Sequence, residues 1–442
     1  MDEPAWQVGG ITIWMAIWWV SESMPIAATS LLPILLFPLF ELVPLKAVLA
    51  PYMHPFVVLL MAGFMAALAI ERWNLHRRVA FRILLSVGTS PNRLILGIMI
   101  ATAVCSMWIS NTASTLIMLP IAMALVSHVR ESAGGQSADV ERFGLVLFLA
   151  LCYSASVGGL GTPVGTPPNL IFMAQHGGIS FLDWLAFGIP TVCVLIPVIW
   201  LYLTMVIGRL PSDLPVGGRN ILRKELDKLG RMKSEEKAVA TVFVGMAVLW
   251  ITREIVISVD AHTGEKEVVG WAPLLGLSKA YAHDALVAVL GALLLFAWPS
   301  KNEKGARLLD WPTAKNIPWD VLLLFGGGIA LAGAFKASGL SEHIVHALSG
   351  LDTLPTPVLI LSIALTVTFL TEVTSNTATA NVMMPLLAGF AASAGVAPEE
   401  VMLPAVLAVS CAFMLPVAPP NLQPWGICRS RDNCASRRSI KT

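Results

Sequence analysis

The tripeptide Ser-Asn-Thr occurs twice in the chain, at 110–112 and at 375–377, and each copy lies within an apolar stretch. Asn is a poor helix former, and Ser, Asn and Thr are favoured at turns and helix N-caps. A hairpin that turned back at this tripeptide inside a bilayer would present backbone N–H groups at the start of its return helix. Such backbone is tolerated at depth only where it lines a cavity. For a single copy, the simpler interpretation is a continuous helix in which Asn bonds to a neighbouring helix.

The two copies belong to a longer internal duplication, whose alignment places Ser110 on Ser375 and which we call the repeat register. In this register VVLLMAGFMAALAI at 57–70 aligns with LLLFGGGIALAGAF at 322–335, and each Ser-Asn-Thr has a proline nine residues after its Asn. Further on, each copy contains a second landmark, GTPPN at 165–169 and APPN at 418–421. Paired helix breaks at corresponding positions of two halves indicate a midplane binding site in secondary transporters. The duplication therefore favours re-entrant hairpins and broken helices over continuous ones.

The chemistry available at both motifs is that of neutral oxygens and amides. No Lys, Arg or His lies within eight residues on either side of either tripeptide. Carbonyls freed by unwinding, together with Ser and Asn oxygens, are hard ligands that suit Na⁺. Exposed N–H groups at helix N-termini suit an anion. An anion held only by neutral groups in a low dielectric is costly, and cations bound beside it would offset that cost, so the motifs indicate symport of a cation with an anion.

The composition indicates which elements must hold these motifs. Only 13% of the 442 residues are charged and 56% are hydrophobic, whereas a soluble domain has about 25% charged residues. Several apolar runs approach or exceed the roughly 20 residues that cross a bilayer, at 11–40, 181–207, 238–257 and 285–298. We therefore predict an all-α polytopic membrane protein.

The basic segments predict the orientation. Residues 209–237 contain eight Lys or Arg residues and are expected to be cytoplasmic. Residues 72–82 contain four arginines and predict an interfacial helix on the same side. Residues 258–280 are expected to form an external loop. Glu22 is expected to break the first apolar run, and Glu372 either to bond within the second hairpin or to tune a cation site.

Other functional classes receive less support from the sequence. The chain has no HExxH or GxSxG motif and no paired intramembrane Asp residues, so no catalytic residue is assigned. None of its six cysteines forms a CxxC pair, which gives no indication of a zinc site or a disulfide framework. The net charge of +1 gives no indication of a nucleic-acid partner. A channel could also use re-entrant loops, but channels usually obtain their symmetry from subunits.

The motifs together resemble the divalent anion/sodium symporters, a family that carries dicarboxylates, citrate or sulfate. The resemblance runs from WMAIWWVSESMPIAATSLLPILLFPLF at 14–40, through both Ser-Asn-Thr motifs, to CAFMLPVAPPN at 411–421. It implies two inverted repeats with re-entrant hairpins and broken helices in a multi-pass protein of the plasma or bacterial inner membrane. It also implies a scaffold domain that forms a homodimer and a transport domain that moves as an elevator.

The resemblance implies two sodium sites and a substrate site between them. The first sodium site would use Ser106, Ser110, Asn111 and Gly159, and the second Thr371, Ser375, Asn376 and Ala418. A small dianionic carboxylate would be held by Asn111 with Thr112 and by Asn376 with Thr377, beside Pro419, which replaces a threonine of the family pattern. Sodium would be the coupling ion, with no other metal and no cofactor.

The expected function is sodium-coupled symport of a succinate-like di- or tricarboxylate, with sulfate as another candidate cargo. The alternatives are a sodium-independent dicarboxylate exchanger, another anion permease of the ion-transporter superfamily, and a non-functional truncated product. A truncated product is considered for two reasons. The family has a further helix before the segment that begins at Trp14, and residues 422–442 are polar and basic where the family continues with apolar helices. A basic cytosolic tail is one interpretation of that segment, and a truncated or frameshifted end is favoured because the apolar pattern stops abruptly at a motif.

The expected domain organisation follows the duplication. It comprises first-repeat scaffold helices with the interfacial helix (1–92), the first-repeat hairpin and broken helix (93–208), a basic cytoplasmic linker (209–237), second-repeat scaffold helices (238–355), the second-repeat hairpin and broken helix (356–421), and the atypical tail (422–442).

Overall fold

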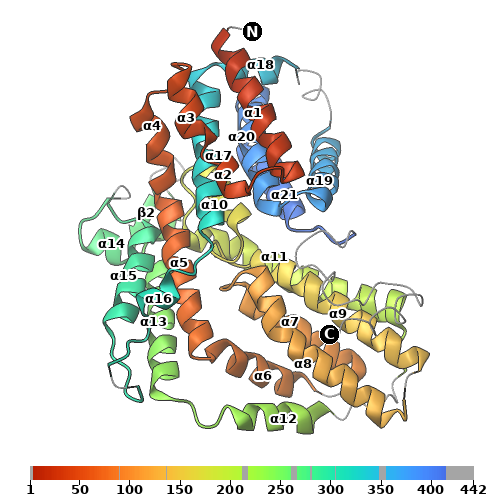
Figure 1. Ribbon diagram of the computed structural model, residues 1–442. Helices are drawn as coiled ribbons and strands as arrows, with labels where there is room; N and C mark the ends of the chain where they lie inside the picture. Colours follow the sequence, from red (N-terminus) through yellow and green to blue (C-terminus); the bar gives the residue numbers. More distant parts are fainter. Residues whose placement is uncertain are drawn as a thin grey trace, which may run out of the picture.

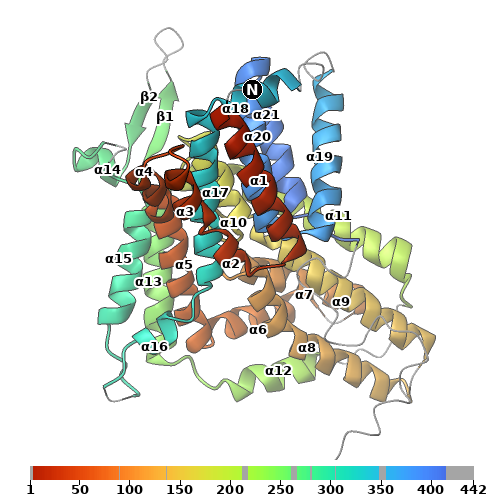
Figure 2. The ribbon, with the colours of Figure 1, turned by 45° about the horizontal axis from the view of Figure 1, so that its top comes forward.

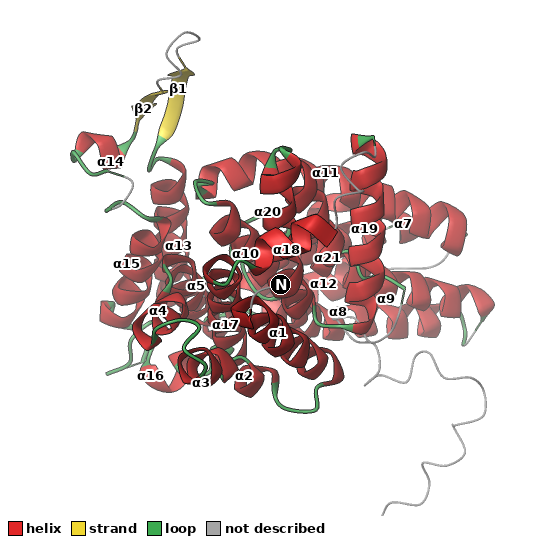
Figure 3. Cartoon of the chain, turned by 90° about the horizontal axis from the view of Figure 1, so that it is seen from above, coloured by secondary structure: helices red, strands yellow, loops and turns green. Residues whose placement is uncertain are grey.

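The computed structural model describes residues 3–88, 90–135, 137–211, 218–259, 266–278, 281–303, 305–347 and 355–414. Helices dominate this part of the chain, and the two strands of a short hairpin project from one side (Figure 3). The predicted all-α architecture is confirmed. Residues 415–442 lie outside the described part, and with them Ala418, Pro419 and the whole of the predicted atypical tail.

The first half of the chain folds as a series of helices (Figure 1). These are α1 (Glu3–Ser21), α2 (Ile26–Thr29), α3 (Leu32–Leu39), α4 (Leu45–Leu49), a 3₁₀ turn (Ala50–Met53), α5 (Pro55–Arg72), α6 (Leu75–Val87), α7 (Pro91–Ser106), α8 (Asn111–Ser132), α9 (Ala138–Gly159), α10 (Pro167–His176), and α11 (Phe181–Leu201), which continues as a π-helical turn (Tyr202–Gly208).

The second half contains the hairpin and the remaining helices. These are α12 (Gly218–Lys228), α13 (Ser234–Ile251), β1 (Ile255–Val259), β2 (Lys266–Val269), α14 (Trp271–Leu274), α15 (Asp284–Ala297), α16 (Trp311–Ala314), α17 (Trp319–Ala337), α18 (Leu340–Ala347), α19 (Thr356–Val373), α20 (Asn376–Ala394) and α21 (Pro398–Val409).

Six helical segments of the described chain are long and apolar enough to cross a membrane. They are Leu45–Arg72, Asn111–Ser132, Ala138–Gly159, Phe181–Gly208, Trp319–Ala337 and Thr356–Val373. Three shorter apolar stretches accompany them, at Ile26–Leu39, Pro91–Ser106 and Asp284–Ala297. The chain is therefore a multi-pass membrane protein, as its composition predicts.

One predicted break is present in the structure, and one predicted segment differs from it. The apolar run 11–40 is not one span, because α1 ends at Ser21 and Glu22 adopts a left-handed φ of 49°, which confirms the expected break at Glu22. The run 238–257 ends as a helix at Ile251, and β1 pairs with β2 in antiparallel register, Ile255 opposite Val269, in place of the plain loop expected over 258–280. The β-branched residues of β1 suit a strand better than a helix.

The predicted duplication reappears in the order of helices. In the repeat register the first residues of α6, α7 and α8 align with those of α18, α19 and α20, and α5 begins within one residue of α17. In Figures 1 and 2, α5 runs from α4 down to α6, whereas α17 runs from α16 up to α18. The two matched helices therefore run in opposite directions, which is the arrangement expected of inverted repeats.

The basic segment before α13 is held against the first repeat. Arg78 of α6, which is buried, donates from Nε to Glu236 Oε2 at 2.6 Å and from Nη1 to Gly230 O at 2.9 Å. The segment around 72–82 is helical as predicted, and the linker contributes a helix of its own, α12, which packs against α6.

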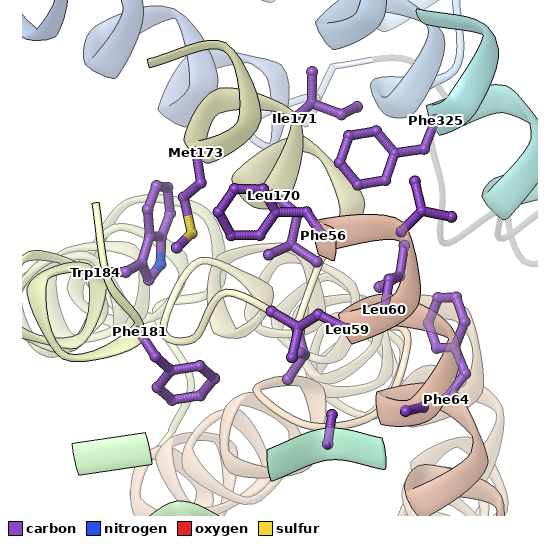
Figure 4. Packing of buried hydrophobic residues seen from close by; sticks show 14 of the residues in the cluster. Phe56, Leu59, Leu60, Phe64, Leu170, Ile171, Met173, Phe181, Trp184 and Phe325 are labelled. Carbon is purple, nitrogen blue, oxygen red and sulfur yellow. The ribbon is translucent and has the colours of Figure 1, made fainter. Parts of the chain in front are cut away.

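The largest apolar cluster joins the two halves of the chain. Figure 4 shows side chains of α5, α10, α11 and α17 meeting in it, among them Phe56, Leu170, Trp184 and Phe325. A second cluster is formed mainly by α6, α7, α8, α9 and α11. Because α10 packs along both α20 and α21, the first-repeat broken helix lies against the second hairpin.

Candidate functional site

Both Ser-Asn-Thr motifs lie where one helix ends and the next begins. In the first hairpin, α7 ends at Ser106 and α8 starts at Asn111, with Ser110 as N-cap; its Oγ accepts from Ala113 N at 3.3 Å. In the second, α19 ends at Val373 and α20 starts at Asn376, with Ser375 as N-cap in an extended conformation. Each tripeptide therefore lies at a break between two helices, as the hairpin interpretation expects, and the continuous-helix alternative is wrong.

Three oxygens converge at the first tip. Ser106 Oγ lies 2.8 Å from Asn111 Oδ1 and 2.6 Å from the carbonyl oxygen of Ala155 in α9. Ser106 is fully buried. A hydroxyl has one proton to donate, so it cannot satisfy both acceptors at once. The hydroxyl, the carboxamide and the backbone carbonyl together form a group of neutral ligands that a cation could coordinate.

The second tip repeats this arrangement with different residue types. Thr371 Oγ1 lies 2.7 Å from Asn376 Oδ1 and 3.0 Å from the carbonyl oxygen of Val409 in α21. Thr371 is fully buried and Asn376 is 7% exposed. Again one hydroxyl proton faces two acceptors. We call these sets the first oxygen cluster (Ser106, Asn111, Ala155 O) and the second oxygen cluster (Thr371, Asn376, Val409 O).

The predicted broken helix supports the first cluster. Helix α9 ends at Gly159, residues 160–166 form turns, and α10 restarts at Pro167. A Cβ added at Gly159 would lie 2.6 Å from Asn111 Oδ1, so only glycine lets this carboxamide approach α9. Asn169 Nδ2 donates to Gly159 O at 2.9 Å and to Thr162 O at 2.8 Å, which holds the break together.

Comparison with known proteins identifies the family of the chain. A sequence model of the family described as "Citrate transporter" matches residues 16–412. The chain belongs to the citrate transporter family. A sodium-dependent dicarboxylate transporter, SdcS of Staphylococcus saprophyticus, is 41% identical over 425 residues, which cover 94% of this chain and 79% of that protein. SdcS of Staphylococcus aureus strain MW2 is 43% identical over 420 residues, covering 93% of this chain and 78% of the relative.

A solved structure shares the fold of this family member. The crystal structure of the Alcanivorax borkumensis YdaH transporter, described as having an unusual topology, aligns with a TM-score of 0.55 at 17% identity. The alignment covers 86% of this chain and 80% of that one. The resemblance to the divalent anion/sodium symporters inferred from the sequence is confirmed by the family match and by the named relatives.

The structure brings together most, but not all, of the residues predicted for the sites of this transporter. Ser106, Asn111 and Gly159 meet at the first tip, with Ser110 adjacent as N-cap. Thr371 and Asn376 meet at the second tip, with Ser375 adjacent. Thr112 is exposed whereas its counterpart Thr377 is 8% exposed. Ala418 and Pro419 lie outside the described residues, and the roles of all these residues as ligands stay predictions.

Three contributors to the site were missed by the sequence analysis. The carbonyls of Ala155 and Val409 carry no sequence signal, because every residue has one. Asn169 had a signal, since it ends the GTPPN landmark, but no role was assigned to it. Its Oδ1 is fully buried and has no hydrogen-bond partner among the residues that the structure describes.

Glu372 forms a contact that neither expected role anticipated. Its Oε1 accepts from Met414 N at 2.9 Å, beyond the end of α21, and the residue is 2% exposed. This bond leaves the hairpin and joins its tip to the segment after α21. Glu372 thus has a structural contact outside the hairpin, and its expected roles within the hairpin or at a cation site stay predictions.

One cavity of the described structure lies away from the tips. A volume of about 540 Å³ lies between α10, α17, α18, α20 and α21, with His176 and Lys336 among its lining residues. Its lining on α20 begins at Pro385, nine residues beyond Asn376, and it contains none of the predicted site residues. The chemistry indicated by the oxygen clusters therefore lies elsewhere.

Proposed function

We propose that this protein is a secondary active transporter that carries a succinate-like di- or tricarboxylate across the cell membrane together with sodium. The observation that carries the proposal is the pair of oxygen clusters, each of which brings a hydroxyl, an Asn carboxamide and a backbone carbonyl together at a helix break. Neutral oxygens beside unwound backbone are the ligands that transporters use for Na⁺. The two SdcS relatives, which are named sodium-dependent dicarboxylate transporters, support the same assignment.

In this proposal each cluster is the core of one sodium site. The first site comprises Ser106, Ser110, Asn111 and Gly159, with Ala155 O as an added ligand. The second comprises Thr371, Ser375, Asn376 and Ala418, with Val409 O as an added ligand. Each cation would replace the hydroxyl-to-amide hydrogen bond by coordination, which needs no large rearrangement because the oxygens already converge.

The substrate carboxylates would bind at the starts of α8 and α20. There the free N–H groups of the first helical turn and the positive end of the helix dipole favour an anion. Asn111 with Thr112 would bind one carboxylate and Asn376 with Thr377 the other, with Pro419 alongside. A cation about 4 Å from a carboxylate contributes about 4 kcal/mol of attraction at an effective dielectric constant of about 20, so two sodium ions would offset the charge that neutral groups leave uncompensated.

The same proposal assigns the moving parts. The hairpins and broken helices, within 93–208 and 356–421, would form a transport domain that moves as an elevator. The remaining helices of 1–92 and 238–355 would form a scaffold that dimerises, joined to the first repeat by the linker 209–237. The packing of α10 along α20 and α21 supports grouping the two hairpin units together.

Uptake of labelled succinate by the purified protein in proteoliposomes tests the function. With an inward sodium gradient we expect uptake, and with choline in place of sodium we expect none. Ser362→Ala is a matched control, because this exposed hydroxyl on α19 bonds only within its own helix. Equal uptake in choline would identify a sodium-independent exchanger instead, and the absence of uptake in both conditions would overturn the proposal for this chain.

A further inference from the structure

The first hairpin tip carries a tryptophan that the second lacks. Trp108 lies in the connection between α7 and α8, two residues after Ser106 and three before Asn111. In the repeat register its counterpart is Val373, whose side chain is 55% exposed. The duplication therefore kept the polar residues of the two tips but not the residue between them.

The Trp108 ring packs against aromatic side chains from outside the hairpin. It meets Phe243 of α13 edge-on, with ring centroids 4.6 Å apart. It lies nearly parallel to Phe181 of α11 at 6.4 Å and to Trp250 of α13 at 6.5 Å. Phe181 and Trp250 stack on each other at 4.3 Å. These four rings form what we call the aromatic cluster.

Buried polar contacts fix the far side of this cluster. The Asp284 carboxylate accepts from Phe181 N at 3.0 Å and pairs with Arg253 Nη1 at 3.0 Å. The Asp284 carbonyl accepts from Trp250 Nε1 at 2.9 Å. Asp284 is 1% exposed, and its buried polar contacts hold Phe181, Trp250 and Arg253 together in this conformation. The aromatic cluster is thus anchored to the starts of α11 and α15 and to the end of α13.

We propose that Trp108 is a positioning residue for the first sodium site, which holds the first oxygen cluster in place by docking the hairpin tip on this anchored cluster. The inference rests on the proposed function, because it concerns the sodium site assigned there. Trp108 is separated from both Ser106 and Asn111 by only one or two residues, so a displacement of its ring moves both oxygens relative to Ala155 O. The second oxygen cluster has no such anchor at the equivalent position, because Val373 is exposed.

The space beside Trp108 explains why its size matters. An apolar cavity of about 160 Å³ adjoins its ring and that of Phe243, lined also by Cys105 and Ile109. A smaller side chain at position 108 would enlarge this cavity and let the tip shift into it. A phenylalanine retains an aromatic face for Phe243 and Phe181, so it should hold the tip better than leucine.

The test compares Trp108→Leu, Trp108→Phe and Val373→Leu in the full chain. In proteoliposomes we expect Trp108→Leu to raise the sodium concentration for half-maximal succinate uptake about tenfold, with the succinate KM at saturating sodium changed less than twofold. Trp108→Phe should restore the sodium response to within about threefold of the parent, and Val373→Leu should leave it unchanged. The rise in thermal stability on adding sodium alone, measured in detergent, should shrink in Trp108→Leu and persist in Val373→Leu.

Several outcomes would overturn the proposal. If Trp108→Leu lowers only the maximal rate, or if Val373→Leu shifts the sodium response equally, Trp108 does not position the site. Where Trp108→Leu yields no folded protein, Phe243→Leu provides the same comparison from α13. A parent protein that shows neither sodium-dependent uptake nor sodium stabilisation would instead refute the proposed function itself, before any variant is compared.

Discussion

The two hairpin tips present the same polar arrangement in different surroundings. Ser106 aligns with Thr371 and Asn111 with Asn376 in the repeat register, yet Val409, which supplies the third oxygen of the second cluster, is not the aligned counterpart of Ala155. Counted from the second landmark of each copy, the two carbonyls are nearly equivalent, because Ala155 lies 14 residues before Asn169 and Val409 lies 12 residues before Asn421. The first tip is tied to α11 and α13 through its tryptophan, and the second to the segment after α21 through its glutamate.

The oxygen clusters are shared by the two repeats, whereas the contacts that hold each tip in place differ between them. The oxygen clusters use only neutral groups and local geometry, so both halves can build them. The contacts that hold each tip are specific to its neighbours: a rigid aromatic contact for one, and a carboxylate that accepts a backbone N–H for the other. Substitutions in the clusters should therefore affect both halves alike, whereas substitutions in the anchors should affect each half differently.

The largest expected effect is the loss of either amide. Asn111→Ala and Asn376→Ala each remove the Oδ1 of one cluster and a proposed substrate contact, so sodium-dependent succinate uptake should fall at least 100-fold in each (about 2.7 kcal/mol). Uptake in proteoliposomes measures this, with the surface level of each variant determined in parallel. Robust transport by Asn111→Ala would mean that the cation ligands are misassigned, and a loss confined to one variant would show that the halves are not equivalent.

A smaller but more selective effect is expected at the first tip alone. Gly159→Ala would place a Cβ 2.6 Å from Asn111 Oδ1, where it forces the carboxamide away from α9. We expect uptake to fall about tenfold to 100-fold and the sodium requirement to rise. Gly245→Ala on α13 is the matched control, because a Cβ there meets nothing within 4 Å and alanine favours a helix. Comparable losses in both variants would point to a general effect of glycine replacement in helices.

Exchanging the two hydroxyl residues tests whether the clusters are interchangeable. Thr371→Ser keeps the oxygen and removes a methyl group, and we expect its sodium response to stay within about threefold of the parent. Ser106→Thr adds a methyl group at a fully buried position and should weaken the response more, while Ser106→Ala removes the oxygen and should weaken it most. Sodium activation curves of uptake rank the three. A ranking in which Ser106→Ala is harmless would exclude the hydroxyl as a ligand.

The sequence could predict the parts of this site that depend on residue type and register. The repeated Ser-Asn-Thr predicted the hairpins, and GTPPN predicted the broken helix. The absence of basic residues predicted neutral oxygen ligands, which stay a prediction. The carbonyls of Ala155 and Val409 could not be predicted, because their position depends on how two helices pack across the tips. Trp108 resembles any membrane tryptophan in sequence, and only its contacts with Phe181 and Phe243 distinguish it.

In the fold, the expected break at Glu22 was correct, whereas the loop expected over 258–280 was not. The run 11–40 is apolar enough for one span, but Glu22 and the prolines that follow divide it into α1, α2 and α3. The segment 255–269 lies between two membrane helices, and its pairing as a hairpin depends on β-branched residues whose preference is weak and set by context. Of the four apolar runs named from the sequence, only 181–207 coincides with a helix of the described chain that is long and apolar enough to span a membrane.

The smallest expected effect concerns the anchor of the second tip. Glu372→Gln keeps an acceptor oxygen for Met414 N, so the protein should lose little stability. Glu372→Leu removes this bond, and because Met414 is exposed the loss should be about 1 kcal/mol. Thermal unfolding in detergent distinguishes the two variants, and Met107→Leu, at the equivalent position of the first tip, provides the matched comparison. If Glu372→Gln is as damaging as Glu372→Leu, the negative charge rather than the bond to Met414 is what the second tip requires, and Glu372 then belongs with the cation site.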